Sequence, residues 1–138
     1  MEFVRNSKEL SEHSSPKNNE KLIKIMQTLK DGQSKDDLPE SLHPKSGYTN
    51  TYAKMWWEKP APTITRNFST PSSSRCIHPR DSRALSIRER ARLQSFPDNY
   101  KFYGNASAKR LQIGNAVPPL LSAALAHAVF DFLRGKNV

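Results

Sequence analysis

The feature that most constrains the fold is the stretch from Pro118 to Leu133, PPLLSAALAHAVFDFL, which predicts a helix that is apolar around most of its circumference. Apart from Ser122, its polar side chains (His127, Asp131 and the following Arg134) fall at i, i+4, i+7 and form one narrow stripe. A helix that is apolar on almost every side is normally buried on almost every side. The upstream segments are short and polar, so we expect this helix to insert into a larger molecule. The alternative is that it packs on the first helix of a compact domain.

Charge is the informative part of the composition. The 138 residues include 22 Lys and Arg against 13 Asp and Glu, a net charge of +9. Such an excess suits an anionic polymer such as nucleic acid, because neutralised phosphates release condensed counterions. A merely basic protein is the alternative. The single cysteine, Cys76, excludes an internal disulfide and a Cys-rich zinc site, and we expect no metal, no membrane span and a cytoplasmic setting.

Upstream, one amphipathic helix is predicted over residues 16–31, with Ser15 as its N-cap and Gly32 closing it in a left-handed conformation. Residues 51–57 and 62–68 are rich in β-branched and aromatic side chains. They predict two short strands, or extended segments joined by the Pro-stiffened connection EKPAP. The tryptophans of the first segment are core or a stacking surface, and core is the interpretation we favour.

A second helix is predicted from the sequence SIRERARLQSFP, because Ser86 followed by Glu89 is a capping-box pattern and Pro97 stops the helix. It carries three arginines, more than solubility requires. These arginines are Arg88, Arg90 and Arg92. Three interpretations are open: they contact phosphates, they pair with buried carboxylates, or they form a solvated basic face.

Several stretches together resemble the C-terminal part of the DNA (cytosine-5) methyltransferase family. They are the PTIT segment that ends the target-recognition region, the ninth family block with its RE-x-x-RLQ-x-FP core, and the tenth block, QIGNAVPP. Their order and spacing agree across about residues 38–133. The resemblance implies an α+β fold, in which a small target-recognition domain of short strands and helices is followed by a C-terminal helix that completes the Rossmann-like domain of a partner chain.

The departures from the family matter as much. The family's Gly-rich cofactor loop, its Pro-Cys pair with the nucleophilic cysteine, and its Glu-Asn-Val stretch do not occur in this sequence. Cys76 does not follow a proline, so an incidental free cysteine is the better interpretation. No catalytic residue is therefore expected in this chain, which should not methylate DNA alone.

The resemblance also implies roles for particular residues. It places the tenth block against S-adenosylmethionine, shared with the partner, through Gly114, Asn115, Ala116 and Val117. It places Thr63, Thr65, Arg66 and Lys54 on double-stranded DNA, with Ile64 anchored inward. It makes a structural scaffold of the ninth block: Arg83, Arg88, Glu89, Arg92 and Gln94.

The resulting hypothesis is the small subunit of a split cytosine-5 DNA methyltransferase of a restriction–modification system, whose large subunit carries the catalytic blocks. It divides the chain into an N-terminal segment (1–37), a target-recognition region (38–75), a small-domain scaffold (76–107) and the tenth block with the last helix (108–138). A stand-alone DNA-binding or regulatory protein derived from such an enzyme is the alternative, and a truncated gene product is a third.

Overall fold

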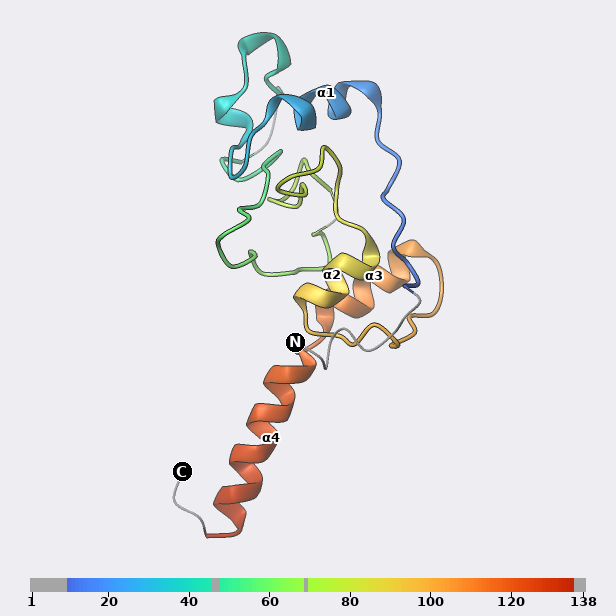
Figure 1. Ribbon diagram of the computed structural model, residues 1–138, viewed down its shortest axis with the longest axis vertical. Coiled ribbons are helices and arrows are strands. Elements are labelled where there is room, and N and C mark those ends of the chain that lie inside the picture. Colours follow the sequence, from blue (N-terminus) through green and yellow to red (C-terminus); the bar gives the residue numbers. More distant parts are fainter. Residues whose placement is uncertain (1–9, 46–47, 69, 136–138) are drawn as a thin grey trace.

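The structure, a computed structural model, describes residues 10–45, 48–68 and 70–135. Regular secondary structure in these residues is helical, and the elements are α1 (Glu20–Thr28), the 3-10 helices η1 (Lys35–Asp37) and η2 (Glu40–Leu42), α2 (Ile87–Leu93), α3 (Ala106–Asn115) and α4 (Pro119–Leu133). In Figure 1, α1 lies at one end of the body, α2 and α3 lie together near the other end, and α4 extends away from it.

The two predicted strands do not form a sheet. In the described part of the chain, β pairing consists of isolated bridges, from Ile77 to Lys54 in parallel and from Ile77 to Ala84 in antiparallel orientation. The strand half of the expected α+β class is therefore wrong, and extended segments joined by a stiff turn are what forms. The prolines of the EKPAP connection lack an N–H and cannot donate to a ladder, which favours irregular extended chain.

A central extended segment divides the interior into two cores. Cys76 and Ile77 are both fully covered but point to opposite sides, as alternation along an extended chain requires. Cys76 joins the larger core, and Ile77 joins the smaller core below α1. The larger core contains Met55, Ile64, Phe68, Cys76, Leu85, Ala91, Phe96, Phe102 and Ile113. The smaller contains Ile25, Met26, Leu29, Leu38 and Ile77.

Helix α1 is shorter than expected. Its N-cap is Asn19, whose side chain accepts the Leu22 N–H at 2.8 Å, so the predicted cap at Ser15 is wrong. The Ser15 hydroxyl instead donates to the Ala84 carbonyl. Gly32 has the expected positive φ of 72°, but it lies beyond the helix end, where the Trp56 ring occupies the space of a Cβ.

Residues 10–15, which we call the strap, cross the body beside α2 and α3. The Glu12 carbonyl accepts the Arg88 N–H at 3.0 Å, and the Glu12 carboxylate pairs with Lys109 of α3. His13 Nδ1 lies 3.2 Å from the Ser86 hydroxyl. The strap therefore joins residues more than 70 positions apart in the sequence.

Helix α3 is not among the helices that the sequence predicts, and it includes Gly114 and Asn115 of the tenth block. They are the last two residues of a ten-residue helix capped by Asn105, whose side chain accepts the Ala108 N–H. The apolar residues of α3 do not share one face, so hydrophobic periodicity gave no signal for it.

Helix α4 has the predicted bounds within one residue, and it is bare. Its seven large apolar side chains are between 49% and 76% exposed: Leu120, Leu121, Leu125, Val129, Phe130, Phe132 and Leu133. Among the described elements, none packs against α4, so the alternative in which it lies on the first helix is wrong. One hydrogen bond, from the Leu120 N–H to the Ser95 hydroxyl at 3.1 Å, ties its first turn to the body.

The sequence predicts no membrane span, but one stretch of the described chain, Ala106–Leu133, is long and apolar enough to cross a membrane by length and composition alone. The stretch is two helices, because Ala116 is extended and Pro118 follows it. Helix α4 alone has 15 residues, and a span needs about 20.

Candidate nucleic-acid interface

The segment Thr63–Arg66 forms an exposed crest on the body. The Ile64 side chain is only 6% exposed and enters the larger core, whereas Thr63, Thr65 and Arg66 face solvent. This is the alternation that the sequence predicts for an extended segment anchored by one apolar residue. Three of the four residues proposed for DNA contact therefore lie together on one accessible edge.

Gln94, which follows α2, holds this crest against α3. Its side chain is almost fully buried, and its Nε2 donates to the Ile113 carbonyl at 3.1 Å and to the Ile64 carbonyl at 3.4 Å. One amide thus joins the end of α2, the crest and the end of α3. Because both acceptors are backbone carbonyls, Gln94 fixes the position of the crest whatever side chains it carries.

Gly114 contacts the crest from the other side. A Cβ at this position would lie 2.2 Å from the Arg66 nitrogen and 2.5 Å from the Thr65 carbonyl carbon. Only glycine permits so close an approach of two backbones. The space expected to serve the cofactor is therefore filled by the crest, and Gly114 is required for packing.

The rest of the tenth block is more open. Asn115 and Val117 are exposed, and Ala116 is half-buried against the larger core. The Asn115 side chain offers an amide donor and an acceptor at the end of a helix, which fits the amino-acid end of S-adenosylmethionine. The fit thus rests on Asn115 and Val117, at the point where the chain leaves the body for α4.

A groove of about 410 Å³ lies on one side of the crest. Thr63 and Thr65 line it together with Trp56, Ser73 and Arg75, and no carboxylate is among its lining residues. Exposed hydroxyls in a groove without carboxylates suit the oxygens of a phosphate backbone. This groove therefore lies directly beside the two threonines that carry proposed DNA contacts.

Arg75 builds the wall of this groove. Its guanidinium stacks on the Trp56 ring, with 4.0 Å from Cζ to the ring centroid, and donates to the Gly32 carbonyl at 2.7 Å. It also donates to the Lys54 carbonyl and to Asn50 Oδ1. Sequence reasoning missed this residue because its partners lie 19 to 43 positions away, and no local pattern marks such a pair.

Lys54 needs a correction. Its side chain is 5% exposed, so it does not lie on the surface where a phosphate contact requires it. Burial lowers the pKa of the Lys54 ammonium, and the charges of Asp31 and Asp81 oppose that effect. Its neighbours Ala53 and Met55 are buried as well, so both faces of this extended segment are covered. We remove Lys54 from the proposed DNA surface.

The two tryptophans separate into different environments. The favoured interpretation of core residues is wrong for both, since Trp56 is half-buried between Gly32 and Arg75 and belongs to neither core. Trp57 is 48% exposed and lies under the Arg80 guanidinium, 3.6 Å from Cζ to the ring centroid. Trp57 is therefore a surface residue, and the Arg80 guanidinium covers its ring.

The arginines of the ninth block hold the body together. Arg88 is fully buried and donates to four acceptors, namely the Ser11 carbonyl and hydroxyl and the carbonyls of Pro97 and Tyr100. Arg92 makes two hydrogen bonds of 2.8 and 2.9 Å with the buried Asp98 carboxylate. These guanidinium groups therefore donate to acceptors within the chain, including a buried carboxylate, and do not form a solvated basic face.

Glu89 caps α2, as the spacing predicts, and pairs with Arg83 through two contacts of 2.8 Å. Burial alone would raise the pKa of the Glu89 carboxyl. Hydrogen bonds from Arg83 and from the Ser86 N–H outweigh burial and lower this pKa to about 2. The carboxylate is therefore held ionised and serves as an anchor for the start of the helix.

Cys76 lies inside the larger core with no exposed surface. Burial raises the pKa of the Cys76 thiol, which keeps it protonated near neutral pH. A methyltransferase nucleophile needs the thiolate and access to a base. The environment of Cys76 is that of a core side chain.

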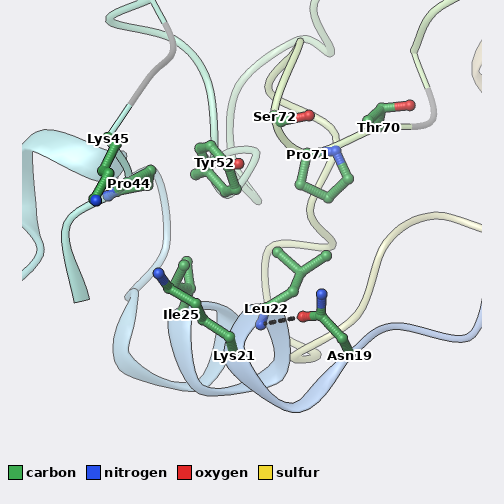
Figure 2. A pocket seen from close by; sticks show the side chains of 10 residues that line it. All are labelled: Asn19, Lys21, Leu22, Ile25, Pro44, Lys45, Tyr52, Thr70, Pro71 and Ser72. Carbon is green, nitrogen blue, oxygen red and sulfur yellow. Dashed lines mark hydrogen bonds between the residues drawn. The ribbon is translucent and has the colours of Figure 1, made fainter.

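A separate pocket of about 450 Å³ lies between α1 and the loops at the far end of the body (Figure 2). Lys21 and Lys45 stand on its rim, and Leu22, Ile25 and Pro71 form its apolar floor. The Asn19 side chain, which also lines it, is occupied by the Leu22 N–H. None of the residues of the crest lines this pocket.

Comparison with known proteins now gives the class of protein to which this architecture belongs. Residues 2–131 match the family model described as C-5 cytosine-specific DNA methylase. The match covers nearly the whole sequence, and the chain belongs to this family.

The relatives that the chain resembles include type II methyltransferases and a plant DNA (cytosine-5)-methyltransferase. The chain is 38% identical over 117 residues to "Type II methyltransferase M1.HphI" of Haemophilus parahaemolyticus, which covers 85% of this chain and 30% of that protein. It is 36% identical over 110 residues to "Type II methyltransferase M.AgeI" of Thalassovita gelatinovora, covering 80% and 25%. "DNA (cytosine-5)-methyltransferase 3" of Arabidopsis thaliana is 38% identical over 114 residues, covering 80% and 8%. The chain thus spans less than a third of the length of these relatives.

Proposed function

We propose that this chain is the small subunit of a split DNA (cytosine-5) methyltransferase of a restriction–modification system. It would supply target recognition, DNA clamping and the cofactor contacts at Asn115 and Val117, which we call the cofactor corner. A separately encoded large subunit would supply the Gly-rich cofactor loop, the nucleophilic cysteine and the catalytic glutamate, none of which occurs in this sequence. The bacterial type II methyltransferases among its relatives support the restriction–modification setting and a cytoplasmic location.

The bare helix α4 is the observation that carries the proposal. Seven large apolar side chains on one helix are about half exposed or more, and no other described element covers them. Monomers seldom leave so much contiguous apolar surface open unless it is an interaction site. Helix α4 begins two residues after Val117, so a domain that covers it would also meet the proposed cofactor corner. The same exposed surface argues against the alternative of a stand-alone DNA-binding protein.

The chemistry would be divided between the chains. When bound, S-adenosylmethionine supplies the methyl group, and in this chain Asn115 and Val117 would contact it. The crest would hold the DNA backbone while the target cytosine leaves the stack for the partner's pocket, since a stacked base is out of reach of a nucleophile. The hydroxyls of Thr63 and Thr65 in the groove beside the crest would donate to phosphate oxygens. The four-segment division of the sequence is part of this proposal.

Co-expression with a cognate large subunit tests the proposal. The two chains should co-elute in gel filtration, and the mixture should transfer labelled methyl groups to duplex DNA. Each chain alone should give no more than background. The proposal fails if adding this chain leaves methyl transfer at the rate of the large subunit alone.

The cofactor corner has its own test in that complex. Asn115→Ala should weaken binding of the methyl donor and leave DNA affinity unchanged, because Asn115 lies at the corner and not on the crest. Thr65→Ala is the matched control and should reverse the pattern. Equal donor affinity in wild type and Asn115→Ala would remove Asn115 from the cofactor site.

A further inference from the structure

The arginines of the body separate into two groups by their partners. Arg75, Arg83, Arg88, Arg90 and Arg92 each donate to carbonyl or carboxylate oxygens inside the chain. Four others have no hydrogen-bond or ion-pair partner for their side chains among the described residues: Arg80 and Arg134 stack on aromatic rings, whereas Arg66 on the crest and Arg110 on α3 do not. Arg110 is half-buried, and its Nε is covered without any acceptor.

Arg66 and Arg110 line the same cleft. It has a volume of about 360 Å³ and lies between the end of the crest and the first two turns of α3. Its other lining residues are Asn67, Ser107, Ala108 and Leu111, so it contains two guanidinium groups and no carboxylate. A cleft with two positive charges and hydroxyl and amide groups has the chemistry of an anion site.

The surroundings of Arg110 point the same way. Arg90, which is 3% exposed, lies close enough for its charge to interact with that of Arg110. Burial first, and then the Arg110 charge, lower the pKa of Arg90 to about 10. A pair of guanidinium groups that repel each other beside an open cleft is stabilised when an anion enters the cleft.

We propose that the cleft between Arg66 and Arg110 binds a backbone phosphate of duplex DNA. The proposal rests on the proposed DNA-recognition function and adds a contact on the side of the crest that faces α3. The cleft and the groove lined by Thr63 and Thr65 flank the same Thr65–Arg66 peptide. A DNA backbone that crosses the crest therefore meets hydroxyls on one side and the arginine pair on the other. A carboxylate of a protein partner is the competing occupant.

The experiment measures DNA affinity as a function of salt for the full chain and for Arg110→Gln. Losing one phosphate contact should reduce the slope of log K against log salt by about 0.9, which at 0.1 M salt corresponds to about eightfold weaker binding. Arg110→Lys should recover most of the slope because it keeps the charge. Lys24→Gln, which removes an exposed charge on α1 at the far end of the body (Figure 1), is the matched control and should change the slope little.

A second variant keeps the test sharp if Arg110→Gln unfolds the chain. Ser107 is exposed in the first turn of α3, where an acidic side chain favours the helix, so Ser107→Glu should fold normally. Its carboxylate would lie at the cleft and should weaken DNA binding more than Lys24→Gln does. Normal affinity and slope in both Ser107→Glu and a folded Arg110→Gln would overturn the cleft while leaving DNA recognition intact. A wild-type chain that binds no duplex even at low salt would overturn both proposals.

Discussion

Helices α2 and α4 differ in burial, and the difference is the opposite of what their compositions suggest. Helix α2 is rich in arginine, yet Arg88 and Arg90 are 0% and 3% exposed. Helix α4 is almost entirely apolar, yet none of its residues is buried. Helix α2 finds its partners within the chain, because carbonyls of the strap and of the loop after α2 accept its guanidinium hydrogens. The partners that α4 requires are not among the described residues. Burial thus follows the supply of partners rather than the polarity of the side chain.

The largest expected effect is on α2. Arg88→Met removes the donor from four acceptors and should lower the free energy of unfolding by about 3–5 kcal/mol, because buried carbonyls are left without a partner. Arg134→Met, in which the lost guanidinium only stacks on the exposed Phe130, should change it by less than about 0.5 kcal/mol. Urea unfolding monitored by circular dichroism measures both. Equal effects of the two variants would remove the contrast between the helices.

Glu89 should produce the next largest effect. Its folded pKa of about 2 lies below the value of 4.5 for a free carboxyl, so its contribution to stability is complete above about pH 4.5 and is lost as the pH falls toward 2. Glu89→Gln should therefore cost about 3 kcal/mol at pH 7. The difference between wild type and variant should shrink on acidification. Unfolding free energies measured between pH 7 and pH 2 check this, and a difference that does not change with pH would contradict the anchored carboxylate.

Gly114 tests the contact between crest and α3. Gly114→Ala places a Cβ 2.2 Å from a backbone nitrogen and should destabilise the chain by about 2 kcal/mol through overpacking. Gly135→Ala is an informative control, because nothing lies within 4 Å of a Cβ there, although its positive φ of 70° adds a small cost. Thermal unfolding compares the two. A Gly114→Ala chain as stable as Gly135→Ala would mean that the crest and α3 separate easily.

The smallest effect on folding is expected in α4. Leu125→Ser together with Val129→Ser should change the stability of the chain alone by less than about 0.5 kcal/mol, because both side chains are more than half exposed. The same pair should abolish co-elution with a large subunit and reduce self-association. Gel filtration with light scattering measures both outcomes. A large loss of stability would show that α4 already packs on the body in solution.

Much of the helical structure could be predicted from local patterns. The capping box of Ser86 and Glu89 and the bounds of α4 required only neighbouring residues. Helix α3 and the start of α1 could not be predicted, because Asn105 and Asn19 cap them through side chains that no periodic pattern announces. The prediction of two strands was wrong for a different reason, because strand pairing depends on partners that are distant in the sequence.

The candidate site divides in the same way. The outward direction of Thr63 and Thr65 followed from alternation around Ile64. In the neighbouring segment both faces are covered, so Lys54 is buried along with Ala53 and Met55, and alternation alone could not predict this. Arg110 was not predicted as a site residue, because the helix that carries it, α3, was not predicted.

The strap has a consequence for the direction from which a partner approaches. It binds the chain at residues 10–15 against α3, the helix that leads out through Ala116–Pro118 into α4, so both routes out of the body lie at one end. The crest touches Gly114 near this same end. A partner that covers α4 would therefore approach the body beside the proposed DNA contacts, while α1 lies at the far end (Figure 1).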